Sequence, residues 1–269
     1  MINNKYYAID SHCHIYPEKI ASLAINHTDE FYDVRSHHKG TFQDLIESKK
    51  ESGIDKYVVQ SVATTPHQVK SINEFIAKNV AINSDTLIGL GTIHPRSEDI
   101  IGDIHHLVDL GLHGIKIHPD IQNFNADDEG YLKMYKECEK LSLPVLVHTG
   151  DSRYDHSNPN RIVPILEKFP NLTMIGAHFG GWSIWETAVN EYERFSNFYV
   201  DCSSSFFYIS METAKELILR YGTDRVLFAT DYPMWNAKTE IDTLLKMELS
   251  DSDYEKIFSK NAMEVYKLK

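Results

Sequence analysis

Two histidines near the N-terminus are spaced so that they could share a metal ion. His12 and His14 lie at the end of the apolar run in "AIDSHCHIYP", residues 8–17. In a β-strand, residues i and i+2 project from the same face, so the two imidazoles would lie side by side. Imidazole nitrogens are common ligands of Zn²⁺ and similar divalent ions. A pair alone does not establish a metal site, because a chain with 14 histidines contains such pairs by chance.

Four other apolar runs also end in residues that could carry chemistry. A polar group at the end of a buried run is costly unless it has a partner. If the runs are parallel strands of one barrel, their ends meet at one rim. Imidazoles and a carboxylate at that rim favour metal-assisted chemistry, in which the ion lowers the pKa of a bound water to about 7 and polarises a carbonyl. These residues are Lys116 and His118 in "KIHP", His148 in "VLVHTG", His178 in "IGAHFGG" and Asp231 in "FATDYP".

The elements that would hold these residues alternate regularly along the chain. Eight short runs are almost continuously apolar, as expected of parallel strands covered on both faces, and segments with helical periodicity separate them. Units of about 30 residues predict a (β/α)₈ TIM barrel, one domain spanning residues 1–269. An open doubly wound sheet is the alternative, but it usually has a Gly-rich turn after its first strand, which this sequence lacks. The predicted strands are 6–12, 56–62, 87–94, 114–119, 143–150, 172–180, 198–205 and 225–233.

One connection is unusually long. Residues 17–40 separate the first strand from a predicted helix at 41–53, which has Thr41 as its N-cap and Gly53 as its C-terminal signal. Connections of this length inside compact domains are usually lids or binding loops. We therefore expect residues 17–40 to lie above the rim.

Composition excludes some classes of partner. The net charge of −12 disfavours nucleic acid and anionic membranes as main partners. No window has the length and apolarity of a transmembrane helix, and the N-terminus lacks the layout of a secretory signal. Three cysteines, Cys13, Cys138 and Cys202, do not suggest a disulfide framework. These features predict a cytoplasmic protein with a small-molecule substrate.

Five motifs together resemble the amidohydrolase superfamily, in the branch that includes aminocarboxymuconate-semialdehyde decarboxylase and related metal-dependent hydrolases. They are "DSHCHI", "GLHGIKIHP", "LPVLVHTGD", "MIGAHFGGW" and "VLFATDYP", in the family's order and spread over nearly the whole chain. The resemblance implies a divalent metal, with zinc expected, one per chain. It implies that the metal ligands are His12, His14, His148 and Asp231. His178 would be the catalytic histidine, or a ligand of a second metal.

Lys116 leaves two interpretations open. In binuclear members of the superfamily, a lysine from the fourth strand is carboxylated and bridges two metals; otherwise it could pair with a substrate carboxylate. A free lysine beside a divalent cation is disfavoured unless it is paired or neutral. His118 would share the face of Lys116 nearer the mouth, which suggests substrate contact. Asp10 could support a metal-bound histidine or make a contact within the strand.

Three residues in loops above the rim are candidates for substrate contact. Arg153 could bind a carboxylate with two parallel hydrogen bonds, or be an exposed loop charge. Trp182 and Trp235 could form the wall of an apolar pocket, or pack on the tops of the following helices.

The sequence favours a hydrolase that cleaves an amide, ester or lactone of a small carboxylated molecule, with Asp231 accepting and returning the proton of the water. The alternative is a nonoxidative decarboxylase of an aryl or unsaturated acid on the same scaffold. A metal-dependent deoxyribonuclease is disfavoured by the acidic charge, and because "KIHP" stands where a ligand glutamate is expected. A non-catalytic metal-binding barrel is the remaining alternative. A homodimer is possible.

Overall fold

The computed structural model describes residues 1–268 and contains parallel strands that pair in the order of the sequence. Parallel pairing connects β1 to β3 and β4 to β9, with one shift of register between β1 and β2. Only Leu90 separates β3 from β4, so the two form the third strand of the barrel in two pieces. The strands are β1 (Ile9–His14), β2 (Lys56–Gln60), β3 (Leu87–Gly89), β4 (Gly91–Thr92), β5 (Ile115–Ile117), β6 (Val145–Val147), β7 (Met174–Gly176), β8 (Phe198–Asp201) and β9 (Val226–Leu227).

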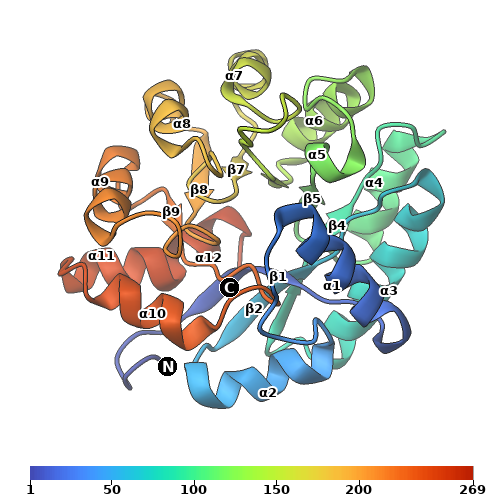
Figure 1. Ribbon diagram of the computed structural model, residues 1–269. Coiled ribbons are helices and arrows are strands. Elements are labelled where there is room, and N and C mark those ends of the chain that lie inside the picture. Colours follow the sequence, from blue (N-terminus) through green and yellow to red (C-terminus); the bar gives the residue numbers. More distant parts are fainter. Residues whose placement is uncertain (269) are drawn as a thin grey trace.

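The sheet closes on itself between its first and last strands. The backbone N–H of Ser11 donates to the carbonyl of Phe228 at 2.9 Å, and Cys13 forms a parallel bridge with Tyr232. With the third strand counted once, the barrel has eight strands, and Figure 1 shows the helices arranged around it. The predicted (β/α)₈ barrel is confirmed.

Helices follow the strands and cover the outside of the barrel (Figure 1). The helix predicted at 41–53 is α2, with Thr41 accepting from the Asp44 N–H and Gly53 in the left-handed conformation at its end. The helices are α1 (Glu18–Tyr32), α2 (Phe42–Ser52), α3 (Val69–Ile82), α4 (Ile100–Asp109), α5 (Pro119–Gln122), α6 (Glu129–Leu141), α7 (Pro159–Lys168), α8 (Trp185–Tyr192), α9 (Met211–Tyr221), α10 (Ala237–Leu245), α11 (Asp251–Glu255) and α12 (Asn261–Val265), with a 3₁₀ turn at Pro66–Gln68 and a π-helical turn at Lys256–Lys260.

Strands of this barrel are buried on both faces, which explains their continuous apolar runs. One face packs against the helices in the larger core cluster. The other face fills the barrel interior with branched side chains, and residues of α12 join that interior cluster. The interior cluster includes Ile9, Val58, Ile88, Leu90, Leu146, Ile175 and Leu227.

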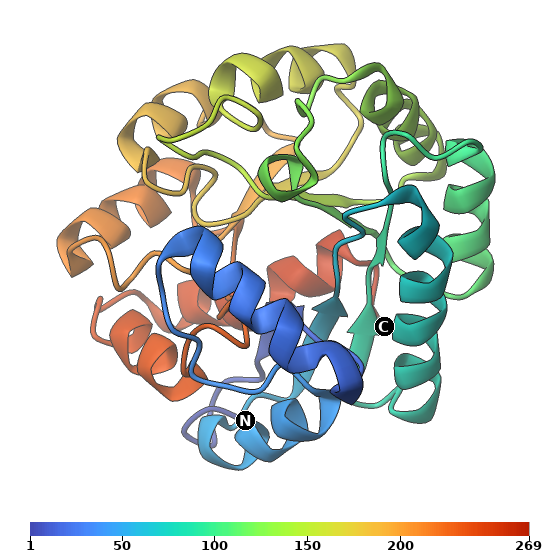
Figure 2. The same ribbon diagram turned by 45° about the vertical axis from the view of Figure 1, so that its right-hand side comes forward.

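The connection over residues 17–40 is not simply a loop, because it contains α1, a helix of 15 residues. Figure 2 shows α1 lying across the face of the barrel. The sequence conceals this helix for physical reasons. Its N-cap, Pro17, makes no side-chain cap bond, it ends at Asp33 rather than at a glycine, and only Ala21 is buried within it. The prediction of a covering segment at this place was right, but its conformation was missed.

Two further findings concern the cysteines and the helices. Cys13, Cys138 and Cys202 are free and buried, in agreement with the prediction that they form no disulfide framework. Within residues 1–268, no helix has both the length and the apolarity needed to cross a membrane.

Candidate active site

Three of the predicted metal ligands converge at the carboxyl end of the barrel. The Nε2 atoms of His12 and His14 lie 3.1 Å apart, and Asp231 Oδ1 lies 3.4 Å and 3.5 Å from them. All three side chains are buried or nearly so. Burial lowers the pKa of both histidines well below the ordinary value, so both are neutral at pH 7. We call these three residues the metal-ligand cluster.

The backbone holds this cluster in an unusual conformation. The register between β1 and β2 shifts between Asp10 and Cys13, and His12 lies within that irregular stretch. Asp231 has a φ of +57°, which places a residue other than glycine in the left-handed region. Asp10 joins the two segments, accepting from the N–H and the hydroxyl of Thr230 at 3.0 Å and 2.6 Å. Asp10 therefore supports the cluster by fixing the backbone on both sides of it.

Asp201 orients His12 from behind. His12 Nδ1 donates to Asp201 Oδ2 at 2.8 Å, and both side chains are buried. A neutral imidazole that donates through Nδ1 carries a lone pair on Nε2. The carboxylate thus points the ligating nitrogen of His12 toward His14 and Asp231, which is the usual support of a metal-bound histidine.

Asp231 is fixed in a similar way from the other side. Its Oδ2 accepts from the hydroxyl of Ser204 at 2.6 Å, and the indole N–H of Trp235 donates to the same hydroxyl oxygen at 2.7 Å. Trp235, which the sequence suggested either as the wall of an apolar pocket or as packing on the following helix, therefore supports a member of the metal-ligand cluster.

Lys116 lies beside the cluster at the floor of the site. Its side chain is buried, and its Nζ is 3.2 Å from His12 Nε2. Burial lowers the pKa of Lys116 to about 8, although Asp201 and Asp231 raise it in part. The amine therefore lies next to the metal-ligand cluster and can be charged or neutral near physiological pH.

A second cluster, which we call the tyrosine-capped cluster, lies opposite the first. It contains His118, Asp120, His148 and the hydroxyl of Tyr32 from the end of α1. The rings of His118 and His148 are stacked, with centroids 3.9 Å apart and planes 7° from parallel. The Tyr32 hydroxyl is 2.7 Å from His118 Nε2 and 3.4 Å from His148 Nε2.

The hydrogen bonds determine which nitrogen of each ring carries the proton. His118 Nδ1 accepts from the backbone N–H of Ile121, so its proton is on Nε2. His178 Nδ1 lies 3.2 Å from the carbonyl oxygen of Ser203, which can only accept, so that Nδ1 is protonated. His178 Nε2 then accepts from His148 Nδ1 at 3.1 Å, which leaves a lone pair on His148 Nε2. His148 can thus ligate a metal through Nε2, whereas His118 presents a donor.

His178 connects the two clusters. It has a φ of +60° and is buried, and burial lowers its pKa to about 4. The Nδ1–H of His178 can donate to the hydroxyl oxygen of Ser203, and that hydroxyl donates to Asp201 Oδ1 at 2.5 Å. His178 is therefore a rigid, neutral side chain between the metal-ligand cluster and the tyrosine-capped cluster.

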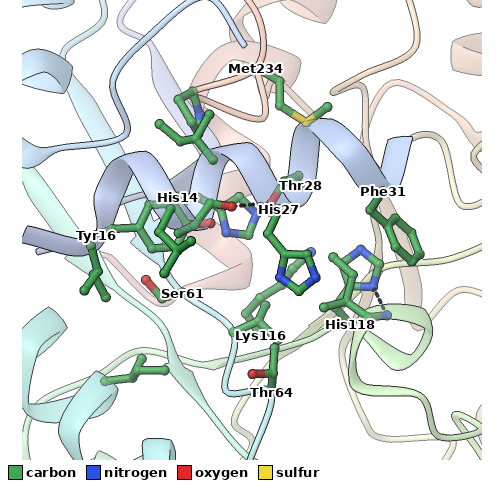
Figure 3. Close-up of a pocket in the computed structure, with 18 of the residues that line it drawn as sticks. His14, Tyr16, His27, Thr28, Phe31, Ser61, Thr64, Lys116, His118 and Met234 are labelled. Atoms are coloured by element: carbon green, nitrogen blue, oxygen red, sulfur yellow. Dashed lines mark hydrogen bonds between the residues drawn. The ribbon is translucent and has the colours of Figure 1, made fainter. Parts of the chain in front are cut away.

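Both clusters face one cavity of about 740 Å³ beneath and beside α1. Figure 3 shows α1 crossing this cavity, with Lys116 and His118 among the residues around it. A cavity of this volume, with mainly apolar walls and a few polar groups, is typical of small-molecule sites. His12, His14, Lys116, His118, His148, His178 and Asp231 all line it.

The structure does not place every predicted residue at this cavity. Arg153 donates to both carboxylate oxygens of Asp151, at 3.0 Å and 2.8 Å, and to the carbonyl of Phe31 at 2.6 Å. Its guanidinium therefore connects the end of α1 to the loop after β6 by hydrogen bonds. Arg153 does not line the 740 Å³ cavity. Trp182 contacts Tyr32 edge to face and, with Trp235, lines a second cavity of only about 10 Å³ behind it.

Several residues of the site were not predicted from the sequence. Asp201 ends β8, so the strand-end rule that selected the histidines could have selected it too. Tyr32 carries no comparable signal, because it comes from a helix that the sequence conceals. Asp120 lies within the short helix α5, and its buried Oδ1 has no hydrogen-bond partner among the described residues.

The fold and the donor set define a barrel with a metal-type site at the carboxyl ends of its strands. A sequence model of the amidohydrolase family matches residues 9–268, and the chain belongs to this family. The chain is 25% identical over 235 residues to a 2-amino-3-carboxymuconate-6-semialdehyde decarboxylase from Dictyostelium discoideum, a match covering 72% of this chain and 64% of that protein. It thus spans less than two thirds of that relative.

Two further proteins resemble the chain over most of its length. A gamma-resorcylate decarboxylase from a Rhizobium species is 24% identical, over 73% of this chain and 75% of that protein. A dihydroxybenzoic acid decarboxylase from a Polaromonas species, solved with bound manganese and the inhibitor 2-nitroresorcinol, superimposes with a TM-score of 0.75. That structure is 19% identical and covers 98% of this chain and 97% of the other. The resemblance to the amidohydrolase superfamily predicted from the motifs is confirmed.

The donor set fits a divalent metal. Two neutral imidazoles and a carboxylate direct their donor atoms at one another within 4.8 Å, and thiolates take no part. Such nitrogen and oxygen ligands suit zinc and manganese alike. The support of His12 by Asp201 and of Asp231 by Ser204 is what a metal site requires around its ligands.

Proposed function

We propose that this protein is a metal-dependent, nonoxidative decarboxylase of a small aryl or unsaturated carboxylic acid. The observation that carries the proposal is the metal-ligand cluster with Lys116 beside it, at the floor of a cavity that admits an organic acid. Two relatives that match the chain are named as decarboxylases, one of 2-amino-3-carboxymuconate-6-semialdehyde and one of gamma-resorcylate. They favour decarboxylation over the hydrolysis that the sequence favoured.

The ligands we assign to the ion are His12, His14 and Asp231, with His148 as the fourth, and one ion per chain. Bound there, a divalent ion supplies positive charge that holds and polarises an anionic substrate. Zinc was expected from the sequence, whereas the Polaromonas structure contains manganese, so elemental analysis must identify the metal.

The chain's own residues have distinct parts in this proposal. Lys116 pairs with an anionic group of the substrate at the cavity floor, and the neutral His178 and His118 donate or accept hydrogen bonds there. During the reaction the bond from the ring carbon to the carboxyl carbon breaks, CO₂ leaves, and a proton replaces it on the carbon. Asp231 is the residue we assign to carry that proton, since its carboxylate lies at the centre of the site.

The test compares two reactions on the purified, metal-loaded enzyme. Hydroxybenzoic acids, including 2,6-dihydroxybenzoic acid, are offered in parallel with lactones and esters of similar size. Release of CO₂ from an acid supports the proposal. Production of acid from a lactone or ester, without CO₂ from any carboxylic acid, would overturn it in favour of hydrolysis.

A further inference from the structure

The cavity extends well beyond the residues that would hold a reacting carboxyl group. Its floor carries the two clusters and Lys116, but its outer part is an apolar groove between α1 and α3. A single benzoate ring at the floor leaves that outer part unfilled in a volume of about 740 Å³. The lining of the outer groove includes Ile20, Leu23 and Ala24 of α1 and Ile72 and Phe75 of α3.

Two walls of this groove are exposed apolar side chains. Leu23 is 73% exposed and Ile20 is 42% exposed, and their spacing of three residues places them on one face of α1. Leu219 on α9 is exposed to a similar degree, 59%, but does not line the cavity. An apolar group lying in the groove would remove Ile20 and Leu23 from water, and such burial favours binding.

The charges around the cavity favour an anion, although the chain as a whole is strongly acidic. Among the described residues that line the cavity, Asp231 is the only acid, and it belongs to the metal-ligand cluster. Lys116 lies at the floor and Lys19 lies on α1. The lining therefore suits a molecule with an anionic end at the floor and an apolar body toward the outside.

We propose that the substrate is a carboxylic acid with an extended apolar substituent that lies in the groove between α1 and α3. This inference rests on the proposed function for the position of the carboxyl end. The extended apolar substituent goes beyond the proposed function, since neither the metal-type site nor the family indicates such a substituent. Ile20, Leu23, Ile72 and Phe75 are then the residues that select the substrate by the size of its apolar part.

The experiment measures binding rather than turnover. The probes are 2-hydroxybenzoates with an unbranched alkyl chain para to the carboxylate, from methyl to hexyl, titrated into the metal-loaded enzyme by calorimetry. Full removal of one methylene from water strengthens binding about fourfold, and contact on one side strengthens it by less. We expect affinity to rise by about 10-fold or more from the methyl to the butyl compound, and then to level off once the chain leaves the groove.

Two matched variants locate the effect. Leu23→Ser is expected to reduce the gain from methyl to butyl several-fold while leaving the affinity for unsubstituted 2-hydroxybenzoate unchanged. Leu219→Ser removes another strongly exposed leucine, outside the groove, and is expected to change neither affinity. An affinity that does not depend on chain length, or an equal loss for short and long probes in Leu23→Ser, would overturn the inference.

The outcomes separate this inference from the proposed function. Tighter binding of long-chain acids without release of CO₂ from any of them would contradict decarboxylation but support the groove. Release of CO₂ from unsubstituted acids, with no gain in affinity from longer chains, would support decarboxylation but contradict the groove. A change from dimer to monomer in Leu23→Ser on gel filtration, with unchanged affinities, would show instead that the groove is covered by a second copy, and would also overturn the inference.

Discussion

The two histidine clusters of the site have similar composition but opposite hydrogen-bonding character. Each contains two histidines and one aspartate whose donor atoms lie within 4.8 Å of one another. In the metal-ligand cluster, Asp201 fixes the proton of His12 on Nδ1, so the lone pair faces the centre. In the tyrosine-capped cluster, the Ile121 N–H fixes the proton of His118 on Nε2, so a donor faces the centre.

This difference teaches that residue type alone does not define a metal site. The tyrosine-capped cluster has the residues of a second metal site, but His118 cannot ligate through the nitrogen that it presents without changing tautomer. The backbone contact of α5 therefore favours a hydrogen-bonding role for His118, in line with our proposal of one metal per chain. His148 differs from His118, because it belongs to the tyrosine-capped cluster but presents a lone pair on Nε2.

The largest effect is expected from the acid of the metal-ligand cluster. Asp231→Asn removes the charge that faces His12 and His14, and should lower metal content to near zero and turnover by at least about 10³-fold. Metal content is measured by elemental analysis after dialysis, and folding by circular dichroism. Full metal content in this folded variant would show that the other ligands suffice and would remove Asp231 from the ligand set.

Asp120 belongs to the tyrosine-capped cluster, and its negative charge is expected to destabilise the folded protein, unlike the charge of Asp231 in the metal-ligand cluster. Burial raises its pKa to about 7, well above the ordinary value of 3.8. A carboxyl group with a raised pKa in the folded state costs no stability below about pH 4, and the cost grows as the pH rises toward 7 and is complete above it. In the metal-free protein, Asp120→Asn should therefore match the wild type at pH 4 and be more stable at pH 8, by up to about 4 kcal/mol.

Denaturant unfolding at several pH values measures this difference. The hydroxyl of Ser157 donates to Asp120 at 2.6 Å, and an asparagine can still accept that bond. A stability difference that is constant from pH 4 to pH 8 would mean that Asp120 is ionised in the folded protein at every pH tested. The carboxylate of the tyrosine-capped cluster would then be available to a cation, and only the tautomer of His118 would distinguish this cluster from the metal-ligand cluster.

Among the described residues, Asp201 contacts His12 of the metal-ligand cluster and the connecting His178, but no member of the tyrosine-capped cluster, so its loss should affect the first cluster more than the second. Asp201→Asn weakens the hold on the Nδ1 proton of His12, and the loss of such a partner typically costs about 10–100-fold in metal affinity. Competition with a fluorescent chelator measures the affinity. Asp224→Asn, at an exposed site just before β9, is the control and should have no effect. Equal affinities in both variants would show that Asp201 serves the fold and not the metal.

The strand ends explain how much of this site could be predicted from the sequence. His12, Lys116, His148, His178 and Asp231 each follow or end an apolar run, and a barrel brings such positions together whatever the loops do. The barrel itself could be predicted for the same reason, since its strands are buried on both faces and strongly apolar.

What could not be predicted depends on contacts that exist only in the folded chain, some of them local and some between distant segments. The proton position on His118 is set by a backbone N–H three residues later, once α5 has formed. Arg153 had the right type for a carboxylate clamp, but Asp151 and the Phe31 carbonyl occupy its guanidinium in the folded chain. Tyr32 reaches the site only because α1 crosses the barrel mouth, and the sequence of α1 lacks clear caps and a buried stripe.

The smallest effect is expected at the hydroxyl that covers the tyrosine-capped cluster. Tyr32→Phe removes the partner of His118 Nε2, leaving a buried donor unsatisfied at a cost of about 1 kcal/mol. The melting temperature should fall by about 2–4 °C in a protein of this size, while metal affinity stays unchanged. Tyr154→Phe changes a neighbouring ring on the same aromatic group around Arg153, and no hydrogen bond of its hydroxyl is seen in the described residues, so it should melt like the wild type. A loss of metal affinity in Tyr32→Phe would mean that the hydroxyl of Tyr32 helps to hold the ion or its ligand His148, and the purely structural role expected for this hydroxyl would be wrong.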